Sequence, residues 1–335
     1  MKQALFICKR RPCGTYAEVA YGLINSAQFV AAELECLGFK AEVVTVQDAN
    51  DIDRVVVRKN PDVVFIEALW VPPQKLGEIL SLPRHRGRKW VIRNHSKIPF
   101  LAGEGIAIEW LQGYRDLGFH NLHISSNSIR GNNDLEIVGI PSVLLPNVYN
   151  PPVPSACPLG DSEWVHVGCF GSIRPLKNQL LQAVAAIRYA EREHRRLAFH
   201  VNGDRVERGG ESAQKNLRAL FRGSRHKLIE HDWMPHGHFI HLVTKMDAGL
   251  CVSYSETFCI VAADFVKAGV PVVGSEDIDW LPEHFVANPN DSEDVSDTLG
   301  RAILADKIPV LRNSARRALD RHNRVALDLW RDFLR

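Results

Sequence analysis

The chain alternates between short apolar runs and longer segments whose apolar residues fall on one side. In the first half, apolar runs predict strands at residues 4–8, 41–46, 62–67, 89–93, 120–125 and 142–145, and residues 19–37 predict a helix that Gly38 ends. In the second half, strands are predicted at residues 165–170, 198–202, 227–231, 248–252 and 271–274, and helices at 178–190, 213–221, 239–245, 259–268 and 314–335. This alternation favours an α/β fold built on parallel sheets.

A segment rich in proline and asparagine, residues 145–154, continues neither a helix nor a strand, and it is the best domain boundary. We therefore predict a domain over residues 1–150, a second over 151–313, and a helical tail over 314–335 that packs back toward the first domain. Each domain is expected to be a doubly wound, Rossmann-like unit, and the two are expected to face a central cleft. Ligands of such sheets bind beyond the carboxyl ends of the strands, so the loops there carry the candidate chemistry.

Composition excludes few classes of protein. Hydrophobic residues make up 45% of the chain and charged residues 24%, which suits a globular protein with two cores. No apolar run reaches the length of a membrane span, and the first residues lack a cleavage site, so we predict neither a transmembrane segment nor a signal peptide. Seven cysteines without a C-x-x-C pair indicate reduced thiols and a cytoplasmic location.

Residues 253–274 carry the most chemical information. A predicted strand ends in a Ser/Glu/Thr loop, and a helix begins near Cys259 with free backbone N–H groups that suit a phosphate or a sugar hydroxyl. Glu256 precedes the helix, and Asp264 follows eight residues later, about 12 Å along the axis at ~1.5 Å per residue. One acid would contact a hexose and the other a ribose across a diphosphate. The alternative is a loop acid and an acid on a solvated helix face.

A second candidate segment, residues 168–179, follows the first predicted strand of the second domain. Gly171 allows close approach of the backbone, and Arg174 and Lys177 would meet a diphosphate at the start of the next helix. Cations are unfavourable at a helix start, so a basic pair there suggests an anion between them. The alternative is two surface cations.

Together these segments resemble the retaining glycosyltransferases of family four. Those enzymes have the GT-B fold and the usual sequence motif Glu-x-Phe-Gly-x-x-x-x-Glu-Ala. Glu256 and Phe258 match the motif, while Cys259 replaces the glycine and Asp264 replaces the second glutamate. The resemblance covers residues 164–274 strongly and the first half weakly. It implies transfer from a nucleoside-diphosphate sugar, by default a UDP-sugar, through an oxocarbenium-like state without a protein nucleophile, a cofactor or a metal.

The resemblance also implies roles for other residues. His95 would contact the transferred sugar, Gly14 belongs to a flexible loop near it, and Trp233 lies in a segment that frames the nucleobase, although packing alone would also explain Trp233 and His95. The predicted catalytic residues are Glu256, His95, Arg174 and Lys177. The predicted donor-binding residues are Gly14, Gly171, Arg174, Lys177, Gly203, Trp233, Met234, Glu256, Thr257, Phe258, Cys259, Ile260 and Asp264.

Basic residues gather in two places of the first domain. Residues 75–97 contain seven basic side chains against only Glu78, and three more follow the first predicted strand. Such clusters favour a polyanionic acceptor, while a solvated basic face or contact with acidic lipid are the alternatives. The predicted acceptor-binding residues are Lys9, Arg10, Arg11, Arg84, Arg86, Arg93 and Lys97.

The identity of the acceptor rests on one further resemblance. The wording of residues 94–104 and 255–264 is similar to glycosyltransferases encoded by bacteriophages, some of which modify hydroxymethylated bases of viral DNA. A hydroxymethylated pyrimidine in DNA is therefore the leading acceptor, and a glycan, lipid or small molecule is the alternative.

Other classes of function were weighed against this interpretation. The D-x-D pairs at Asp51 and Asp277 lie in polar loops, and we interpret them as structural. The histidines His236, His238 and His241 have the residue type of metal ligands, but no fourth ligand accompanies them, so we interpret them as the start of a solvated helix. A sugar-nucleotide epimerase or a non-catalytic sugar-nucleotide-binding module remains possible on the same fold. A dinucleotide oxidoreductase is disfavoured, because no G-x-G-x-x-G follows a strand.

Overall fold

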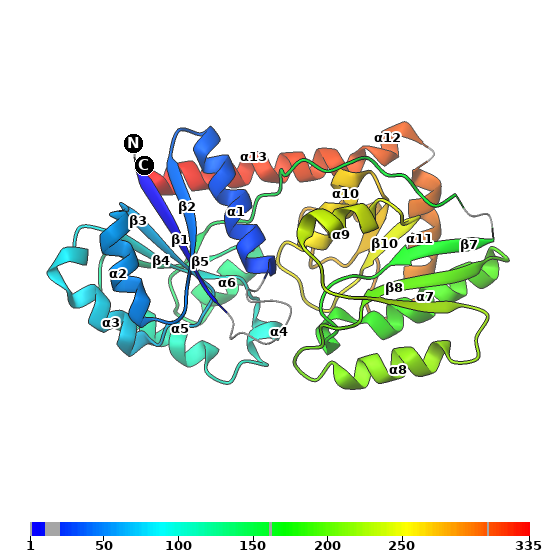
Figure 1. Ribbon diagram of the computed structural model, residues 1–335, viewed down its shortest axis with the longest axis horizontal. Coiled ribbons are helices and arrows are strands. Elements are labelled where there is room, and N and C mark those ends of the chain that lie inside the picture. The colour runs from blue at the N-terminus through cyan, green and yellow to red at the C-terminus, as the bar shows by residue number, and fades with distance from the viewer. Residues whose placement is uncertain (1, 11–20, 161–162, 307) are drawn as a thin grey trace. The chain divides into compact units, whose positions relative to one another are not determined.

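A computed structural model describes residues 2–10, 21–160, 163–306 and 308–335. The chain forms two compact units (Figure 1). Unit 1 comprises Met1–Pro151 together with His322–Arg335, and unit 2 comprises Pro152–Arg321. Each unit contains one parallel sheet with helices between the strands, so the predicted α/β fold with two sheets is confirmed.

Unit 1 holds a six-stranded sheet in the order β2-β1-β3-β4-β5-β6, in which all neighbours are parallel. Its strands are β1 (Gln3–Lys9), β2 (Lys40–Val46), β3 (Val63–Glu67), β4 (Lys89–Asn94), β5 (Leu122–Ser126) and β6 (Val143–Leu144). Its helices are α1 (Tyr21–Cys36), α2 (Asn50–Lys59), α3 (Pro73–Ser81), η1 (Pro83–His85), α4 (Ile98–Leu101), α5 (Ala107–Asp116) and α6 (Ile129–Ile137).

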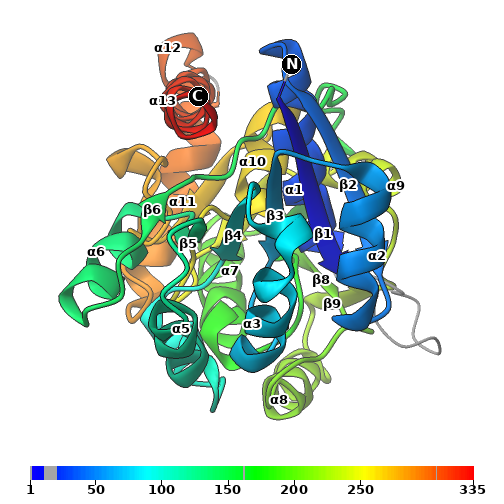
Figure 2. The same ribbon diagram turned by 90° about the vertical axis from the view of Figure 1, so that its left-hand side faces the viewer.

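The sheet of unit 1 is buried on both faces, as the apolar runs of its strands require. One face packs Leu5 and Val64 against α2, α3, α5 and α6, while the other packs Phe6 and Phe65 against α1 and the end of the C-terminal helix (Figures 1 and 2). Alternate residues of each strand thus enter opposite cores.

Unit 2 holds a five-stranded parallel sheet in the order β11-β10-β7-β8-β9. Its strands are β7 (Trp164–Gly168), β8 (Arg196–Asn202), β9 (Lys227–His231), β10 (Ala248–Cys251) and β11 (Val272–Gly274). Its helices are η2 (Pro175–Lys177), α7 (Gln179–Arg192), α8 (Glu211–Phe221), α9 (His236–Val243), α10 (Ile260–Ala268), η3 (Glu283–Phe285), α11 (Ser292–Ala305), α12 (Pro309–Arg312) and the start of α13 (Ser314–Leu334).

Helix α13 begins in unit 2, and its last residues belong to unit 1. Ala326, Trp330 and Leu334 are buried in the core of unit 1, and the ring of Trp330 lies 5.2 Å from that of Phe65. The indole N–H of Trp330 donates to the carbonyl of Pro146 at 2.8 Å, which satisfies its one polar group. The C-terminal helix therefore packs on the first domain, as predicted.

Two parts of unit 2 differ from the sequence prediction. Helix α9 begins at His236, three residues before the predicted start, because Pro235 and His236 extend its first turn. Helix α11 was not predicted at all, although the Asp291 side chain caps its first turn by accepting from the amides of Glu293 and Asp294. The start of this helix mixes apolar and polar residues, and its buried positions include Ser296, Thr298 and Gly300, so no apolar side marks it in the sequence.

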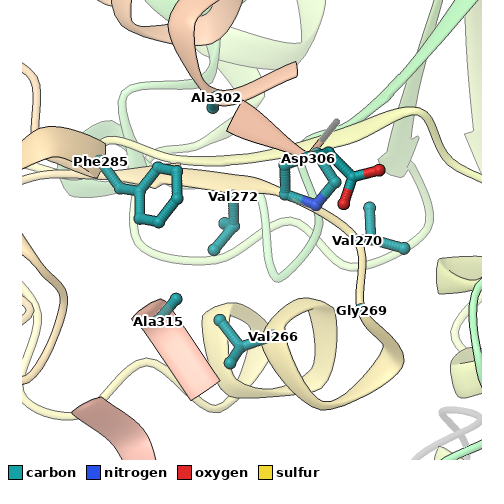
Figure 3. A pocket seen from close by; sticks show the side chains of 9 residues that line it. Val266, Gly269, Val270, Val272, Phe285, Ala302, Asp306 and Ala315 are labelled. Atoms are coloured by element: carbon teal, nitrogen blue, oxygen red, sulfur yellow. The ribbon is translucent and has the colours of Figure 1, made fainter. Parts of the chain in front are cut away.

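An apolar pocket lies between α10, β11 and α11 (Figure 3). Its lining residues are mostly aliphatic or small, among them Val266, Val272, Phe285 and Ala302, and Asp306 supplies one carboxylate. None of the residues that the sequence predicts to bind a sugar nucleotide lines it. This pocket is therefore packing space and not the candidate donor site.

Candidate functional site

The two candidate segments of unit 2 meet at the carboxyl edge of its sheet. Lys177, in the loop after β7, forms an ion pair with Glu256, in the loop after β10, and the hydroxyl of Ser253 donates to the same carboxylate at 3.0 Å. Lys177, Glu256 and Cys259 line one small pocket together with Cys169 and Cys251. Residues that are 79 positions apart in sequence are thus in direct contact.

Both members of this ion pair are held in their charged forms. Burial by itself would raise the pKa of the Glu256 carboxyl, but the charge and hydrogen bond of Lys177, together with Arg174 and Ser253, outweigh burial and lower that pKa below its usual value. Burial likewise opposes the charge on Lys177, and Glu256 raises its pKa above the usual value. The edge of the sheet therefore carries a fixed ammonium and a fixed carboxylate, only 13% and 9% exposed.

The loop before Lys177 has the backbone freedom that the sequence predicts. Gly171 adopts a φ of +108°, a conformation that favours glycine, and its amide donates to the side chain of Asn202 at 2.9 Å. Arg174 lies within 3.9 Å of the Glu207 carboxylate, which also accepts from Arg205 at 2.8 Å. Glu207 is thus paired with a second cation besides Arg174.

Helix α10 begins at this edge with a strained residue. Cys259 is its N-cap and has a φ of +57° where the resembling family has glycine, so the left-handed backbone is kept although the side chain differs. The first amides of α10, from Ile260 on, have no carbonyl partner within the helix and are suited to bind an anion.

Phe258 does not offer its side chain to a ligand. It is 2% exposed, its ring packs against Trp280, and its carbonyl accepts from the Trp280 indole at 2.7 Å. Its predicted role in donor binding is therefore wrong as a side-chain contact, because the apolar ring is more stable in the core. Thr257, beside it, is half-buried.

Asp264 is also buried, but it has a polar partner. Its side chain is 1% exposed and lies 2.8 Å from Nε2 of His236, whose ring is 22% exposed. The sequence interpretation of His236 as a solvated helix residue is wrong, because the histidine packs against the acid of α10.

The segment after β9 lies beside the loop after β8. The amide of Trp233 donates to Asp204 at 2.8 Å, and the Arg205 guanidinium lies 4.1 Å from the centre of its ring. Met234 is half-buried. Gly203 has no room for a side chain, since an added Cβ would lie 2.6 Å from Glu230. Both loops follow parallel strands and so lie at the same sheet edge as Lys177.

Unit 1 has its own polar network at the carboxyl ends of β3 and β4. Nε2 of His95 lies 2.5 Å from the Glu67 carboxylate, and the same carboxylate accepts from Arg93 at 2.9 Å. Burial lowers the pKa of His95 below its usual value, although the charge of Glu67 opposes this shift. Burial would raise the pKa of Glu67, but Arg93 and His95 outweigh it and lower that pKa. His95 is therefore a neutral, oriented imidazole at pH 7.

Several predicted acceptor residues have internal roles. Arg93 is fully buried, donates to Glu67 and Asn147, and cannot touch an acceptor, so that prediction is wrong. Lys97 is 4% exposed at the start of α4, and Arg84 forms a two-point ion pair with Asp53. A linear count of charges does not show which ones a fold pairs internally.

Of the remaining predicted residues of unit 1, three are exposed and two are not described by the structure. Arg86, Lys9 and Arg10 are exposed. Arg11 and Gly14 lie outside the residues that the structure describes.

The acids of the two D-x-D pairs have structural partners. Asp277 accepts from the amide of Glu256 at 3.0 Å, and Asp51 accepts from Arg54. Among the residues that the structure describes, no group of three or more His, Cys, Asp or Glu is arranged to hold a metal ion. Nor does any helix in the described parts of the chain combine the length and apolarity needed to cross a bilayer.

The sequence of unit 2 matches a known family. Residues 166–303 match the family described as Glycosyl transferases group 1, and this stretch contains Arg174, Lys177, Glu256 and Asp264. The chain is a glycosyltransferase. The predicted class of enzyme is thereby confirmed, and among curated proteins no match to the sequence is found.

Solved structures share the fold of this glycosyltransferase. HepE from Anabaena, solved with UDP and glucose, has a TM-score of 0.68 at 15% identity over 96% of this chain and 95% of its own. Sucrose-phosphate synthase from Thermosynechococcus elongatus has a TM-score of 0.71 at 14% identity over 99% and 98% of the two chains. A glycosyltransferase from Rickettsia africae has a TM-score of 0.64 at 12% identity over 99% and 97%. These neighbours support the predicted GT-B fold.

Sequence reasoning missed two partners in this glycosyltransferase. Glu67 ends an otherwise apolar strand, and a charged residue at such a place is a signal for a buried polar network. His236 directly follows the Trp-Met-Pro segment, but nothing in the sequence links it to Asp264, which is 28 positions away.

Proposed function

We propose that this glycosyltransferase moves a sugar from a UDP-sugar to a hydroxyl acceptor with retention of configuration. The contact between Lys177 and Glu256 carries the proposal, because it joins the two sequence segments that were independently assigned to a sugar nucleotide. HepE structures hold UDP or UDP-glucose, which supports uracil as the base of the sugar donor.

The proposed chemistry is stabilisation of a leaving diphosphate. Charge builds on the diphosphate as the glycosidic bond breaks, and a cation or an amide already in place lowers the energy of that state. Arg174, Lys177 and the first amides of α10 are the groups assigned to this task. Glu256, already ionised beside Lys177, is assigned to the hydroxyls of the sugar.

The proposal requires no protein nucleophile. The resemblance to retaining family-four enzymes supports attack by the acceptor on the face from which UDP leaves. His95 is proposed to contact the transferred sugar as a neutral imidazole, which Glu67 holds in one orientation. No step is assigned to a metal or a cofactor.

The acceptor is proposed only as a hydroxyl compound. Three of the seven basic residues in the cluster that favoured DNA form ion pairs within unit 1: Arg93 with Glu67, Arg84 with Asp53 and Lys75 with Glu78. No observation on the structure favours DNA over a glycan, lipid or small molecule.

Turnover of a panel of sugar nucleotides tests the proposal. The purified protein is incubated with UDP-, GDP- and ADP-sugars and with glycan, lipid and hydroxymethylated DNA acceptors, and mass spectrometry detects transfer. We expect Arg174→Ala to lower kcat about 100-fold with little loss of stability, because Arg205 still pairs with Glu207. Arg196→Ala is the matched control, since Arg196 is a surface arginine of unit 2 paired with Glu163; it should leave kcat unchanged.

Three outcomes would contradict the proposal. Release of an isomerised sugar without any transfer would indicate an epimerase. Binding of a sugar nucleotide without turnover would indicate a binding module. Equal turnover by Arg174→Ala and the wild type would remove Arg174 from the mechanism.

A further inference from the structure

The pair formed by Asp264 and His236 joins a buried carboxylate to a partly exposed imidazole. Asp264 lies within α10, and His236 is the first residue of α9. The carboxylate is 1% exposed and the imidazole 22%, and 2.8 Å separates Oδ1 of Asp264 from Nε2 of His236. A ligand that arrives from solvent can therefore touch the histidine but not the acid.

The contact also determines which nitrogen of the His236 imidazole carries the hydrogen. A carboxylate only accepts hydrogen bonds, so Nε2 of His236 carries the hydrogen in this pair. In a neutral ring the other nitrogen, Nδ1, is then an acceptor, suited to a hydroxyl group. Asp264 thereby holds both the tautomer and the direction of the ring.

The position of His236 along the chain points to one part of a nucleotide. Pro235 precedes His236, and just before Pro235 come Trp233 and Met234, which belong to the segment that the family resemblance assigns to the nucleobase. The sugar directly bonded to a base is the ribose. Of the two acids whose spacing fits a hexose and a ribose, Glu256 is assigned to the transferred sugar, which leaves the ribose to Asp264. The order of residues along the chain and the spacing of the acids therefore point to the same pair.

We propose that His236 is the residue that binds a ribose hydroxyl of the sugar donor and that Asp264 acts through it as a positioning residue. The inference rests on the proposed function, because it needs a nucleoside diphosphate at this edge of the sheet. It moves the ribose contact from the acid, which is buried, to the histidine, which is accessible.

Discrimination between ribose and deoxyribose tests this assignment. Titration calorimetry gives the Kd of UDP, 2′-deoxy-UDP and 3′-deoxy-UDP for each protein, with ADP and GDP in parallel. Removal of the bonded hydroxyl should weaken binding to the wild type about tenfold, the cost of one hydrogen bond. His236→Phe should bind UDP and both deoxy forms with equal affinity, because it keeps a ring but has no nitrogen.

Matched variants separate binding from folding. His238→Ala removes an exposed histidine of the same helix and should keep the tenfold ratio. The double variant His236→Phe/Asp264→Leu removes both polar partners from the buried contact, so it carries the test if the single variant fails to fold. Asp264→Leu alone should lower the ratio to near one, whereas Asp264→Asn, which keeps an acceptor for Nε2, should retain at least half of it.

The outcomes distinguish this inference from the proposed function. If the His236 variants bind UDP and keep the tenfold ratio, the assignment of His236 is wrong and the sugar-nucleotide site stands. If the wild type binds UDP with no preference over the deoxy forms, the assignment is likewise wrong. If the wild type binds none of UDP, ADP and GDP, the proposed function and this inference are both wrong.

Discussion

Two histidines of this glycosyltransferase are held by carboxylates that are more buried than the histidines themselves. Glu67 is fully buried while His95 is 10% exposed, and Asp264 is 1% exposed while His236 is 22% exposed. In each pair the acid orients the ring, and the ring is the more exposed of the two side chains. A side chain fixed by a buried partner binds a ligand with less loss of conformational entropy.

Loss of the Glu67 charge should destabilise unit 1. In Glu67→Gln the guanidinium of Arg93 remains fully buried without a compensating charge, so we expect the free energy of unfolding to fall by about 3 kcal/mol. Denaturation in urea measures the change. The control is Glu78→Gln, which breaks an exposed pair with Lys75 and should change stability by less than about 1 kcal/mol. Equal effects of the two variants on the free energy of unfolding would mean that burial of the Glu67–Arg93 pair adds nothing to the stability of unit 1.

At the scale of residues, the sequence predicts which side chains belong to the candidate site better than it predicts which side chains pair with one another. Arg174, Lys177 and Glu256 are recognisable because each stands at the end of an apolar strand or the start of a helix. That Lys177 pairs with Glu256 depends on the order of strands in the sheet, which the sequence pattern does not show. Arg93 was misassigned for the same reason, because its partner Glu67 lies on the neighbouring strand.

At the scale of elements, the apolar runs and the turn-forming residues between them were sufficient to predict the strands. All eleven strands observed in the described residues overlap a predicted one, with ends that differ by at most two residues. Buried parallel strands are nearly continuous apolar runs, which is why they stand out. Helix α11 was missed because apolar and polar residues are mixed at its start, and its clearest signal is the single cap residue Asp291.

The cap of α11 gives a prediction at this scale. Asp291→Ala removes the acceptor for the amides of Glu293 and Asp294, so the free energy of unfolding should fall by about 1 kcal/mol. Asp291→Asn keeps an oxygen acceptor and should retain most of the stability. Thermal melts of both variants check this order, and a more stable Asp291→Ala protein would show that the cap does not stabilise the helix.

At the scale of the whole molecule, a row of histidines around the buried His200 links stability to pH. His166, His200 and His231 form a row across β7, β8 and β9, with 3.0 Å and 2.9 Å between their ring nitrogens. Burial, together with the neighbouring histidines, lowers the pKa of His200 from 6.5 to about 3, so the folded chain keeps this ring neutral. Burial also lowers the pKa of His231.

The sign of the pH effect follows from these shifts. Between pH 6.5 and about 3 the unfolded chain binds a proton at His200 and the folded chain does not, so stability is present above pH 6.5 and is lost as pH falls. We expect urea denaturation to show a loss of roughly 2–3 kcal/mol between pH 6.5 and pH 4.5. His200→Gln should show a shallower loss, and a loss as steep as that of the wild type would exclude His200 as its source.

The central claim is that unit 2 binds the diphosphate of a sugar donor beside Lys177 and the start of α10. A crystal structure of the protein with UDP tests it most directly. We expect the phosphate oxygens within hydrogen-bond distance of Lys177, Arg174 and the first amides of α10, and the ribose beside His236. UDP bound elsewhere, with these side chains still turned to their present partners, would contradict the account.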